Sequence, residues 1–379
     1  MNNISTDKRP VLFHLVTGFQ VGGAEKMLER VLPRLTDFHH VVLSLTKSGP
    51  MEDAYNRVGL ETIVLGYQHP LNLKAFIKFF RAVHQYHPEI LTTYLVHADI
   101  IGRIWGWLTG IPVTICSLRA RFRGREYNWL LRFSRLFDFL VDGYLANSEA
   151  VRSYYLTRWH SPSKKFTIIT NGLEPDAYKI QLSEKESQDF RSRFYIPFDA
   201  KIIGTVSQLR SEKKVDRLIK AWQIVHTQEP KAYCLIIGDG PLRNSLEKLV
   251  HELGVGSHIR FLGLQNDIPA ILPNFDIFTL PSAYEGMSNA ILEAMASGLP
   301  VIANNLKENQ EVIDPAVGIL VDTQSPELYA KSLILLLGQP DLRHRLGQVA
   351  RQKIAQHFKL TDKINQLNKY YWQKIKSKT

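Results

Sequence analysis

Short apolar runs alternate with longer amphipathic stretches along most of the chain. In the first half these runs predict seven strands, at residues 11–16, 40–45, 62–65, 90–95, 112–117, 143–146 and 166–170. The spacers are mostly long enough to hold a helix each. Strands that alternate with helices are typical of a parallel sheet with helices on both faces.

The alternation pauses once and then resumes. Residues 173–200 are polar, contain Pro175 and Pro197 and hold no strand-like run, which predicts a linker and the first helix of a second domain. Six further strands are predicted at residues 201–206, 233–237, 259–262, 276–280, 300–303 and 318–321. We therefore predict an α/β protein of two doubly wound, Rossmann-like domains. Ligands of such sheets bind at the carboxyl ends of the strands, so a ligand is expected in a cleft between the domains.

Length and composition agree with this prediction. The 379 residues are too many for a single ordinary core, and 45% hydrophobic with 22% charged residues is typical of a globular protein. Cys116 and Cys234 are too few for a disulfide framework and favour a reducing compartment, so a cytoplasmic location is expected. The N-terminus lacks a signal-peptide pattern, and no uncharged apolar run approaches the roughly 18 residues that span a bilayer.

The net charge of +11 predicts an acidic partner, which could be nucleic acid, anionic lipid or a phosphorylated substrate. Two segments of the first half combine basic and apolar residues. One is residues 73–86, and the other holds Arg119, Arg121, Arg123, Arg125, Arg132 and Arg135. Such segments are suited to an anionic membrane surface. The alternative is a solvated basic face over ordinary core aromatics.

Residues 276–303, DIFTLPSAYEGMSNAILEAMASGLPVIA, hold the most informative motif. They predict a strand, a loop with Glu285 and Gly286, and a helix capped by Ser288 or Asn289. The first backbone N–H groups of that helix lack intrahelical partners and attract anions, which predicts a diphosphate site. These groups belong to Met287, Ser288 and Asn289.

Two carboxylates in this motif can bind hydroxyl groups. Glu293 lies about one turn into the predicted helix and can accept hydrogen bonds from the vicinal hydroxyls of a ribose. Glu285 can do the same for a sugar. The alternative is a loop acid followed by a helix acid that stabilises the helix dipole.

In these residues the chain resembles the retaining glycosyltransferases of the GT-B fold, called family 4 or group 1. Their signature is two glutamates separated by seven residues, seen here as Glu285 and Glu293, within a PS-EG-EAMA-G-PV frame. The resemblance implies a first domain over residues 1–180 that binds the acceptor. It implies a second domain over residues 181–357 that binds a nucleotide sugar, and a helix over 358–379 that crosses back to the first domain.

Three shorter segments extend the resemblance. They are Gly22-Gly23-Ala24-Glu25, Asn171-Gly172-Leu173-Glu174 and Gly238-Asp239-Gly240-Pro241. In the family the first of these lets the backbone approach the diphosphate and the acceptor closely. Each segment, taken alone, also fits ordinary turn chemistry.

Residues 204–222 resemble the donor-phosphate segment of the family, and Lys213 falls on its phosphate-binding lysine. Two lysines at a helix start oppose the dipole, so we interpret them as binding an anion. This chain departs from the family here, because Gln208 stands at the arginine position and Lys214 at the glycine position. Gln cannot supply a charged fork to phosphate, and Arg210 is the candidate substitute.

A second departure concerns the first domain. Many members carry a histidine after the fourth or fifth strand, near the anomeric centre, whereas this chain has none at that point. Arg119 stands there and would point at the donor phosphates or at an anionic acceptor. His97 is the alternative polar group of that cleft.

The resemblance implies an enzyme that moves a sugar from a UDP- or GDP-linked donor to a glycan or lipid-linked acceptor, as in bacterial polysaccharide or lipopolysaccharide assembly. It implies no metal, and a location peripheral to the inner face of the cytoplasmic membrane. A catalytically silent GT-B binding subunit is one alternative, motivated by Gln208 and the missing histidine. An NAD-dependent oxidoreductase is less favoured, because no G-x-G-x-x-G motif follows a strand. A nucleic-acid binder would need a recognised module, and none is present.

Overall fold

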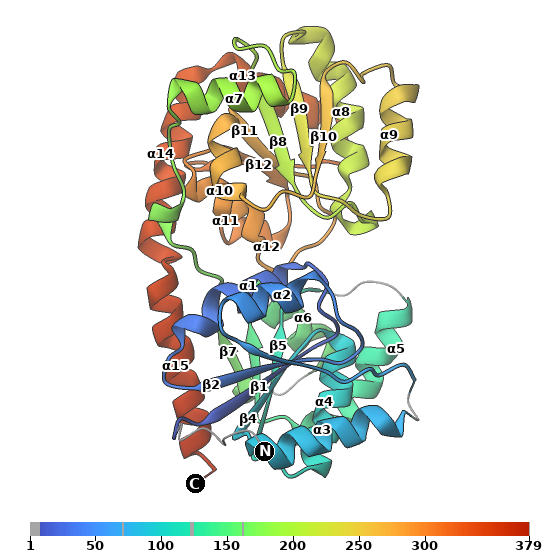
Figure 1. Cartoon of the computed structure of the whole chain (residues 1–379). Helices are drawn as coiled ribbons and strands as arrows, with labels where there is room; N and C mark the ends of the chain where they lie inside the picture. Colours follow the sequence, from blue (N-terminus) through green and yellow to red (C-terminus); the bar gives the residue numbers. More distant parts are fainter. Residues whose placement is uncertain (1–7, 70–71, 122–124, 161–162, 379) are drawn as a thin grey trace. The chain divides into compact units, whose positions relative to one another are not determined.

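The computed structural model describes residues 8–69, 72–121, 125–160 and 163–378 (Figure 1). The chain divides into two compact units. Unit 1 holds residues 1–171 and 360–379, and unit 2 holds residues 172–359. Each unit contains one parallel sheet with helices on both faces, so the predicted α/β class with two doubly wound domains is confirmed.

The sheet of unit 1 has seven strands in the order β3-β2-β1-β4-β5-β6-β7, and its neighbours pair in parallel. The winding reverses between β1 and β4, which lie side by side at the centre. The strands are β1 (Val11–Val16), β2 (His39–Ser44), β3 (Glu61–Val64), β4 (Ile90–Tyr94), β5 (Val113–Leu118), β6 (Gly143–Ala146) and β7 (Phe166–Ile168).

Alternate residues of β1 enter two cores, one on each face of this sheet. The helices of the unit are α1 (Gly23–Val31), α2 (Pro50–Arg57), α3 (Leu73–Tyr86), α4 (Val96–Leu108), α5 (Arg125–Ser134), α6 (Glu149–Trp159) and α15 (Leu360–Lys376). Leu12 and Val16 pack with α1, α2 and α15, whereas Phe13 and Leu15 pack with α3 and α4.

The sheet of unit 2 has six strands in the order β10-β9-β8-β11-β12-β13, and its winding reverses between β8 and β11. Its strands are β8 (Ile202–Val206), β9 (Tyr233–Ile237), β10 (Ile259–Gly263), β11 (Ile277–Leu280), β12 (Val301–Asn304) and β13 (Gly318–Val321). Its helices are α7 (Glu184–Arg193), α8 (Val215–Gln228), α9 (Arg243–Glu252), α10 (Ile268–Ile271), α11 (Asn289–Ala296), α12 (Lys307–Gln310), α13 (Pro326–Gly338) and α14 (Pro340–His357).

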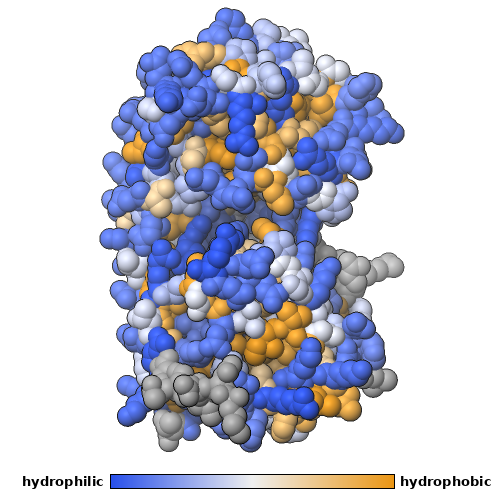
Figure 2. Space-filling model, in the orientation of Figure 1, coloured by the Kyte–Doolittle hydropathy of each residue, from blue (hydrophilic) through white to orange (hydrophobic). Residues whose placement is uncertain are grey.

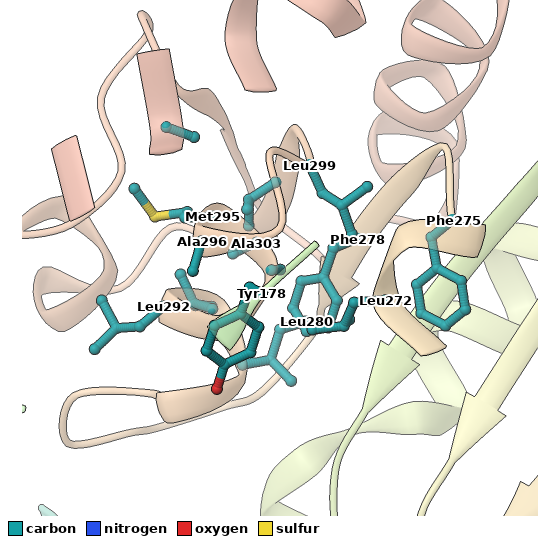
Figure 3. Packing of buried hydrophobic residues seen from close by; sticks show 14 of the residues in the cluster. Tyr178, Leu272, Phe275, Phe278, Leu280, Leu292, Met295, Ala296, Leu299 and Ala303 are labelled. Atoms are coloured by element: carbon teal, nitrogen blue, oxygen red, sulfur yellow. The ribbon is translucent and has the colours of Figure 1, made fainter. Parts of the chain in front are cut away.

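Helix α11 is fixed on one face of this sheet by apolar contacts. In Figure 3 its residues Leu292 and Met295 lie in the same buried cluster as Phe278 and Leu280 of β11. On the other face α8 and α13 pack together over Ile203 and Ile277. Both ends of the β11–α11 connection are therefore anchored in the core.

The last helix, α15, completes the core of unit 1. Tyr370 and Tyr371 are buried there, and a Cβ atom at Gly143 would lie only 2.2 Å from the Tyr370 hydroxyl. The indole N–H of Trp372 donates to Asp37 at 3.3 Å, and Nζ of Lys374 donates to the carbonyl oxygen of Asp142 at 2.6 Å.

Two buried histidines join the central strands of unit 1. Nε2 of His14 lies 3.0 Å from Nδ1 of His40, and Nδ1 of His14 lies 3.2 Å from the hydroxyl of Tyr94. Nε2 of His40 lies 3.0 Å from the carbonyl oxygen of Leu35. Burial, and to a smaller degree the charge of His40, lowers the pKa of His14 well below its usual value. Burial also lowers the pKa of His40 to about 4.

Lys214 adopts a left-handed backbone conformation, with φ of 52°, just before α8 begins. A side chain with a Cβ atom is strained in this region, whereas glycine is not. The family pattern has glycine at this position, so the conformation explains that preference. Lysine at position 214, where the family has glycine, therefore strains the backbone.

We expect unit 1 to lose stability in mild acid, because the unfolded chain takes up protons that buried His14 and His40 do not. For a histidine with a lowered pKa, the stabilisation is complete above the usual pKa of 6.5 and falls as the pH drops from there to about 4. His40 alone accounts for about 3 kcal/mol over that window. The measurement is the free energy of unfolding in urea as a function of pH. A double variant, His14→Leu with His40→Leu, should show a shallower slope, and His251→Leu at an exposed site should not. Equal slopes for wild type and double variant would contradict the argument.

We expect Lys214→Gly to raise the free energy of unfolding by about 1 kcal/mol, because it removes left-handed strain. Lys220→Gly is the matched control, since Lys220 is exposed within α8 and glycine there should cost about 1 kcal/mol. Urea denaturation of both variants checks the sign of each change. A destabilised Lys214→Gly protein would show that the lysine side chain contributes more than its backbone conformation costs.

Candidate functional site

The centre of the unit 2 sheet brings two loops together at its carboxyl edge. β8 and β11 are neighbours, but β9 and β10 continue from β8 whereas β12 and β13 continue from β11. Loops that leave such a switch point diverge and open a crevice, which is where doubly wound sheets bind ligands. One loop runs from Val206 to α8 and the other from Leu280 to α11.

An ion pair joins these two loops. Nζ of Lys213 lies 2.6 Å from Oε1 of Glu285, and the backbone N–H of Ala283 donates to the carbonyl oxygen of Glu212 at 2.8 Å. The two charged side chains are 21% and 9% exposed, so both have lost most of their water. Charge-assisted hydrogen bonds of this length are strong, and removing one partner leaves the other buried and unpaired.

Glu285 gives Lys213 a negatively charged partner within the chain. A lysine at the start of α8 was interpreted as needing a bound anion. The structure supplies an anion from the chain itself, the carboxylate of Glu285. The position of Lys213 beside a helix start therefore does not by itself require a ligand.

A polar brace that the sequence did not reveal holds the Glu285 loop. The side-chain amide of Asn304 donates to the carbonyl oxygen of Ser282 at 2.9 Å, and the hydroxyl of Thr323 donates to that of Pro281 at 3.2 Å. Arg217 of α8 in turn donates to the Thr323 hydroxyl at 3.0 Å. The brace fixes the start of the loop to β12 and α8. Its members lie far apart in the sequence, so no local pattern pointed to them.

The predicted helix after this loop is present. Its N-cap is Ser288, whose hydroxyl accepts a hydrogen bond from the N–H of Ile291 at 3.4 Å, so the alternative cap at Asn289 is not the one used. The side chains of Met287 and Ser288 are buried, and Glu293 lies partly exposed one turn into α11. Anion binding by the first N–H groups and ribose binding by Glu293 stay predictions.

The glycines after β9 are required by packing. A Cβ atom at Gly238 would lie 1.9 Å from the carbonyl oxygen of Ser207, and one at Gly240 would lie 2.6 Å from that of Leu209. The N–H of Leu209 donates to the carbonyl oxygen of Asp239 at 2.9 Å, which binds the two loops together. Because neither glycine has a Cβ atom, the backbones of the two loops can lie in direct contact.

Gln208 and Arg210 lie on the same β8 loop and differ in exposure. Gln208 is partly buried, whereas Arg210 is exposed. Within the part of the chain that the structure describes, the Arg210 side chain makes no hydrogen bond or ion pair. Among the described residues, no hydrogen bond or ion pair thus joins Arg210 to Lys213 or Glu285, and the helping role of Arg210 stays a prediction.

The candidates of unit 1 lie at the carboxyl edge of its own sheet. Gly22 is the N-cap of α1, and a Cβ atom there would lie 2.3 Å from Oε2 of Glu25. Gly23 is the first residue of the helix. His97 is exposed in the first turn of α4, beyond the end of β4 at Tyr94. These residues follow β1 and β4, the two strands between which the winding reverses.

Arg119 directly follows β5 and is partly buried. Its Nε donates to the hydroxyl of Ser117 at 3.1 Å, and its Nη1 donates to the side-chain oxygen of Asn171 at 2.8 Å. The guanidinium carbon lies 5.9 Å from the centre of the Tyr94 ring. The sequence had singled out Asn171 only as part of a turn motif, so its contact with Arg119 was missed.

The described residues were also compared with the requirements of a metal site and of a membrane-spanning helix. Among the described residues, no group of three or more His, Cys, Asp or Glu side chains is arranged to hold a metal ion. In the same residues no helix has the length and apolar character needed to cross a bilayer.

Family profiles match both halves of the chain. The profile described as "Glycosyltransferase Family 4" matches residues 21–177, and the one described as "Glycosyl transferases group 1" matches residues 186–353. The second match contains the Lys213 and Glu285 loops and α11, and the first contains the candidates of unit 1.

Curated relatives carry related names. A UDP-Gal:alpha-D-GlcNAc-diphosphoundecaprenol alpha-1,3-galactosyltransferase of Escherichia coli is 24% identical over 86% of this chain and 87% of its own length. An uncharacterised glycosyltransferase of Methanocaldococcus jannaschii is 28% identical over 61% of this chain, and the match spans 57% of that relative. A lipopolysaccharide core glycosyltransferase of Rhizobium meliloti is 30% identical over 47% of this chain and 52% of its own length.

Solved structures share the fold at low identity. HepE of Anabaena, in complex with UDP and glucose, has a TM-score of 0.87 at 20% identity and covers 96% of this chain and 100% of that one. The glycosyltransferase WaaG has a TM-score of 0.75 at 17% identity and covers 94% of this chain and 98% of that one. Family profiles for both halves, named relatives and a shared two-sheet architecture lead to one conclusion, that this chain belongs to the group 1, or family 4, glycosyltransferases.

Proposed function

We propose that the protein transfers a sugar from a UDP- or GDP-linked donor to a glycan or lipid-linked acceptor with retention of anomeric configuration. The observation that carries this proposal is the shielded pair of Lys213 and Glu285, held at the switch point of unit 2 next to the start of α11. A cation, a carboxylate and a helix N-terminus at one sheet edge suit a ligand that has both a diphosphate and hydroxyl groups.

In this proposal each residue of unit 2 has a separate role. Lys213 neutralises the leaving diphosphate, which its ammonium can do while still bonded to Glu285, because it has three N–H donors. Glu285 accepts hydrogen bonds from the sugar hydroxyls, and Glu293 accepts them from the ribose. The N–H groups that begin α11 would add to the charge stabilisation, so the proposal requires no metal.

In the proposed transfer step, the acceptor attacks the face of the sugar from which the diphosphate leaves. The bond between the anomeric carbon and the donor phosphate oxygen breaks, and the acceptor oxygen bonds to that carbon on the same face. The acceptor proton passes to a donor phosphate oxygen. In unit 1, Gly22 and Gly23 would allow close approach of the backbone to the substrates, and Arg119 or His97 would lie near the acceptor.

Relatives support a role in the assembly of bacterial surface polysaccharide. Their names include an enzyme acting on a diphosphoundecaprenol-linked sugar, a capsular polysaccharide transferase and a lipopolysaccharide core transferase. Structures of Anabaena HepE in complex with UDP and with UDP-glucose support a uridine donor. We therefore propose a saccharide acceptor carried on lipid at the cytoplasmic side of the membrane.

We expect Lys213→Met to lower the affinity for UDP by about tenfold to hundredfold, because a charged hydrogen bond to phosphate is lost. The rate of transfer should fall by about 100-fold or more. Lys220→Met, an exposed lysine of α8, is the matched control and should change neither quantity. The measurements are UDP titration by calorimetry and a transfer assay with UDP- and GDP-linked sugars.

Removing Lys213 also leaves Glu285 buried without its partner, so Lys213→Arg serves as a second variant that keeps the charge. Tight UDP binding without any transfer by the wild type would favour the catalytically silent subunit, which Gln208 motivates. Unchanged UDP affinity in Lys213→Met would remove the phosphate role of the lysine.

A membrane surface is the second part of the proposal, and α3 supports it. Leu73, Ile77 and Phe80 form an exposed apolar stripe, at 65%, 39% and 51% exposure. An adjacent exposed stripe is basic and holds Lys74, Lys78 and Arg81. Figure 2 shows apolar residues reaching the surface of unit 1 among hydrophilic ones, on the face that carries α3 in Figure 1. Apolar and basic stripes on one helix suit an anionic lipid surface.

The other predicted basic segment is divided by the structure. Arg132 and Arg135 are exposed beside the exposed aromatics Trp129 and Phe133, as a membrane-facing segment requires. Arg119 is partly buried and Arg121 is buried, so neither belongs to that surface. Arg123 lies outside the described residues, and so does the side chain of Arg125.

We expect the protein to float with vesicles that contain phosphatidylglycerol and not with pure phosphatidylcholine. The double variant Leu73→Ser, Phe80→Ser should lose most of this binding, and each neutralised lysine of α3 should weaken it by about fivefold. The control is Phe198→Ser with Leu264→Ser, which removes two equally exposed apolar residues from unit 2. Equal flotation of the α3 variant and the control would show that α3 is not the lipid-binding surface.

A further inference from the structure

Arg119 is a cation at a ligand-binding edge without a matching carboxylate. It follows the carboxyl end of β5 in unit 1, and its hydrogen-bond partners, Ser117 and Asn171, are both neutral. Within the described residues, no ion pair joins Arg119 to an acid, whereas Arg103 in the same unit pairs with Asp138 at 2.9 Å. Partly buried charges are normally paired, so an unpaired arginine is unusual.

The aromatic groups around Arg119 do not supply the missing negative charge. Tyr94 and Tyr371 are the ionisable neighbours that favour its charged form. Burial raises the pKa of both phenols above the usual value, so both stay neutral. Burial also lowers the pKa of Arg119, yet a guanidinium remains protonated at neutral pH. The positive charge is therefore uncompensated in the free protein.

The guanidinium is nevertheless held in a fixed orientation. An arginine has five N–H donors, and the contacts with Ser117 and Asn171 use two of them, one on Nε and one on Nη1. Tyr94 supports the group from one side, with its ring centre 5.9 Å from the guanidinium carbon. The remaining donors form a planar fork of the kind that binds phosphate or carboxylate in a bidentate manner.

Tyr94 is in turn held by the buried histidines His14 and His40. The donor and the acceptor of each hydrogen bond between them follow from the one bond to a backbone carbonyl. The carbonyl oxygen of Leu35 can only accept, so Nε2 of His40 carries the proton and Nδ1 accepts. His14 then donates from Nε2 to His40 and accepts at Nδ1 from the hydroxyl of Tyr94. The proton of Tyr94 thus points into the core, and its ring cannot turn without breaking this chain. We refer to Leu35, His40, His14 and Tyr94 as the histidine chain.

We propose that Arg119 binds an anionic oxygen group, most simply a phosphoryl group, at the carboxyl edge of the unit 1 sheet, and that the histidine chain holds Tyr94 beneath it. In this proposal Arg119 contacts the ligand, and His14, His40 and Tyr94 are positioning residues. The inference rests on the proposed function, which places Arg119 near the acceptor, and it adds the chemical class of the ligand; its phosphate titration does not depend on the role proposed for Lys213. The phosphoryl group could belong to the acceptor or to the donor diphosphate.

The test is calorimetric titration of the full chain with inorganic phosphate and, separately, with UDP. Phosphate affinity should fall by about tenfold to hundredfold in Arg119→Met, the loss expected for hydrogen bonds to a charged group. It should fall by about tenfold in Arg119→Lys, which keeps the charge but loses the fork. Arg57→Met, at an exposed arginine of unit 1, is the control and should bind phosphate as the wild type does.

Lys213→Met separates the two sites and the two sources of phosphate. If phosphate binding survives in Lys213→Met and is lost in Arg119→Met, the anion site is in unit 1. A loss of UDP affinity in Arg119→Met would then assign the phosphoryl group to the donor, and unchanged UDP affinity would assign it to the acceptor. Phosphate binding that is unchanged in both Arg119 variants would overturn the proposal, whatever the fate of the donor site.

The role of the histidine chain needs its own measurement. Tyr94→Phe keeps the ring beneath Arg119 and removes only the hydroxyl that bonds to His14. Phosphate affinity in this variant should fall by several-fold, while cooperative unfolding is retained. Tyr86→Phe, which removes a hydroxyl bonded to Glu61 elsewhere in unit 1, is the matched control. Equal phosphate affinities in the two tyrosine variants would show that the chain is structural only.

Discussion

Parallel pairing at the centre of each sheet decides where chemistry can occur in this molecule. In unit 2, β8 lies beside β11, and the chain leaves these two strands in opposite directions. Lys213 and Glu285 are 72 positions apart in the sequence, yet the pairing sets them 2.6 Å apart. In unit 1 the same reversal between β1 and β4 places Gly22, Gly23 and His97 after neighbouring strands. Strand order, more than any single residue, gives each unit a polar edge.

The cations at the two sheet edges differ in whether the chain neutralises their charge. In unit 2 the charge of Lys213 is neutralised by the carboxylate of Glu285, and this ion pair joins the two loops. In unit 1 Arg119 has only neutral partners, and its position depends on aromatic packing and on hydrogen bonds that run through the core. A neutralised site favours loop order before a ligand arrives, whereas an uncompensated cation attracts anions over a longer range.

The sequence predicted the architecture well, because strand periodicity and length are local properties. All thirteen predicted strands are present, and Ser288 caps the helix that follows the Glu285 loop. What it could not predict are contacts between distant segments. The brace of Asn304 and Thr323 on the Glu285 loop and the bond from Arg119 to Asn171 arise only when the sheets form. The contact between Lys213 and Glu285 also joins distant segments, so the sequence did not reveal it. Lys213 was therefore interpreted as binding the anion of a ligand.

The docking of α15 in unit 1 has a consequence for synthesis on the ribosome. Unit 2 is built from the continuous segment 172–359, whereas unit 1 needs both residues 1–171 and residues 360–379. The core around Leu12 and Val16 includes Leu367 and Tyr371 of α15, so it stays incomplete until residues 360–376 have been synthesised. The second unit to be made is therefore the first that can finish folding. The nascent unit 1 meanwhile exposes an apolar face that chaperones or the closing helix must cover.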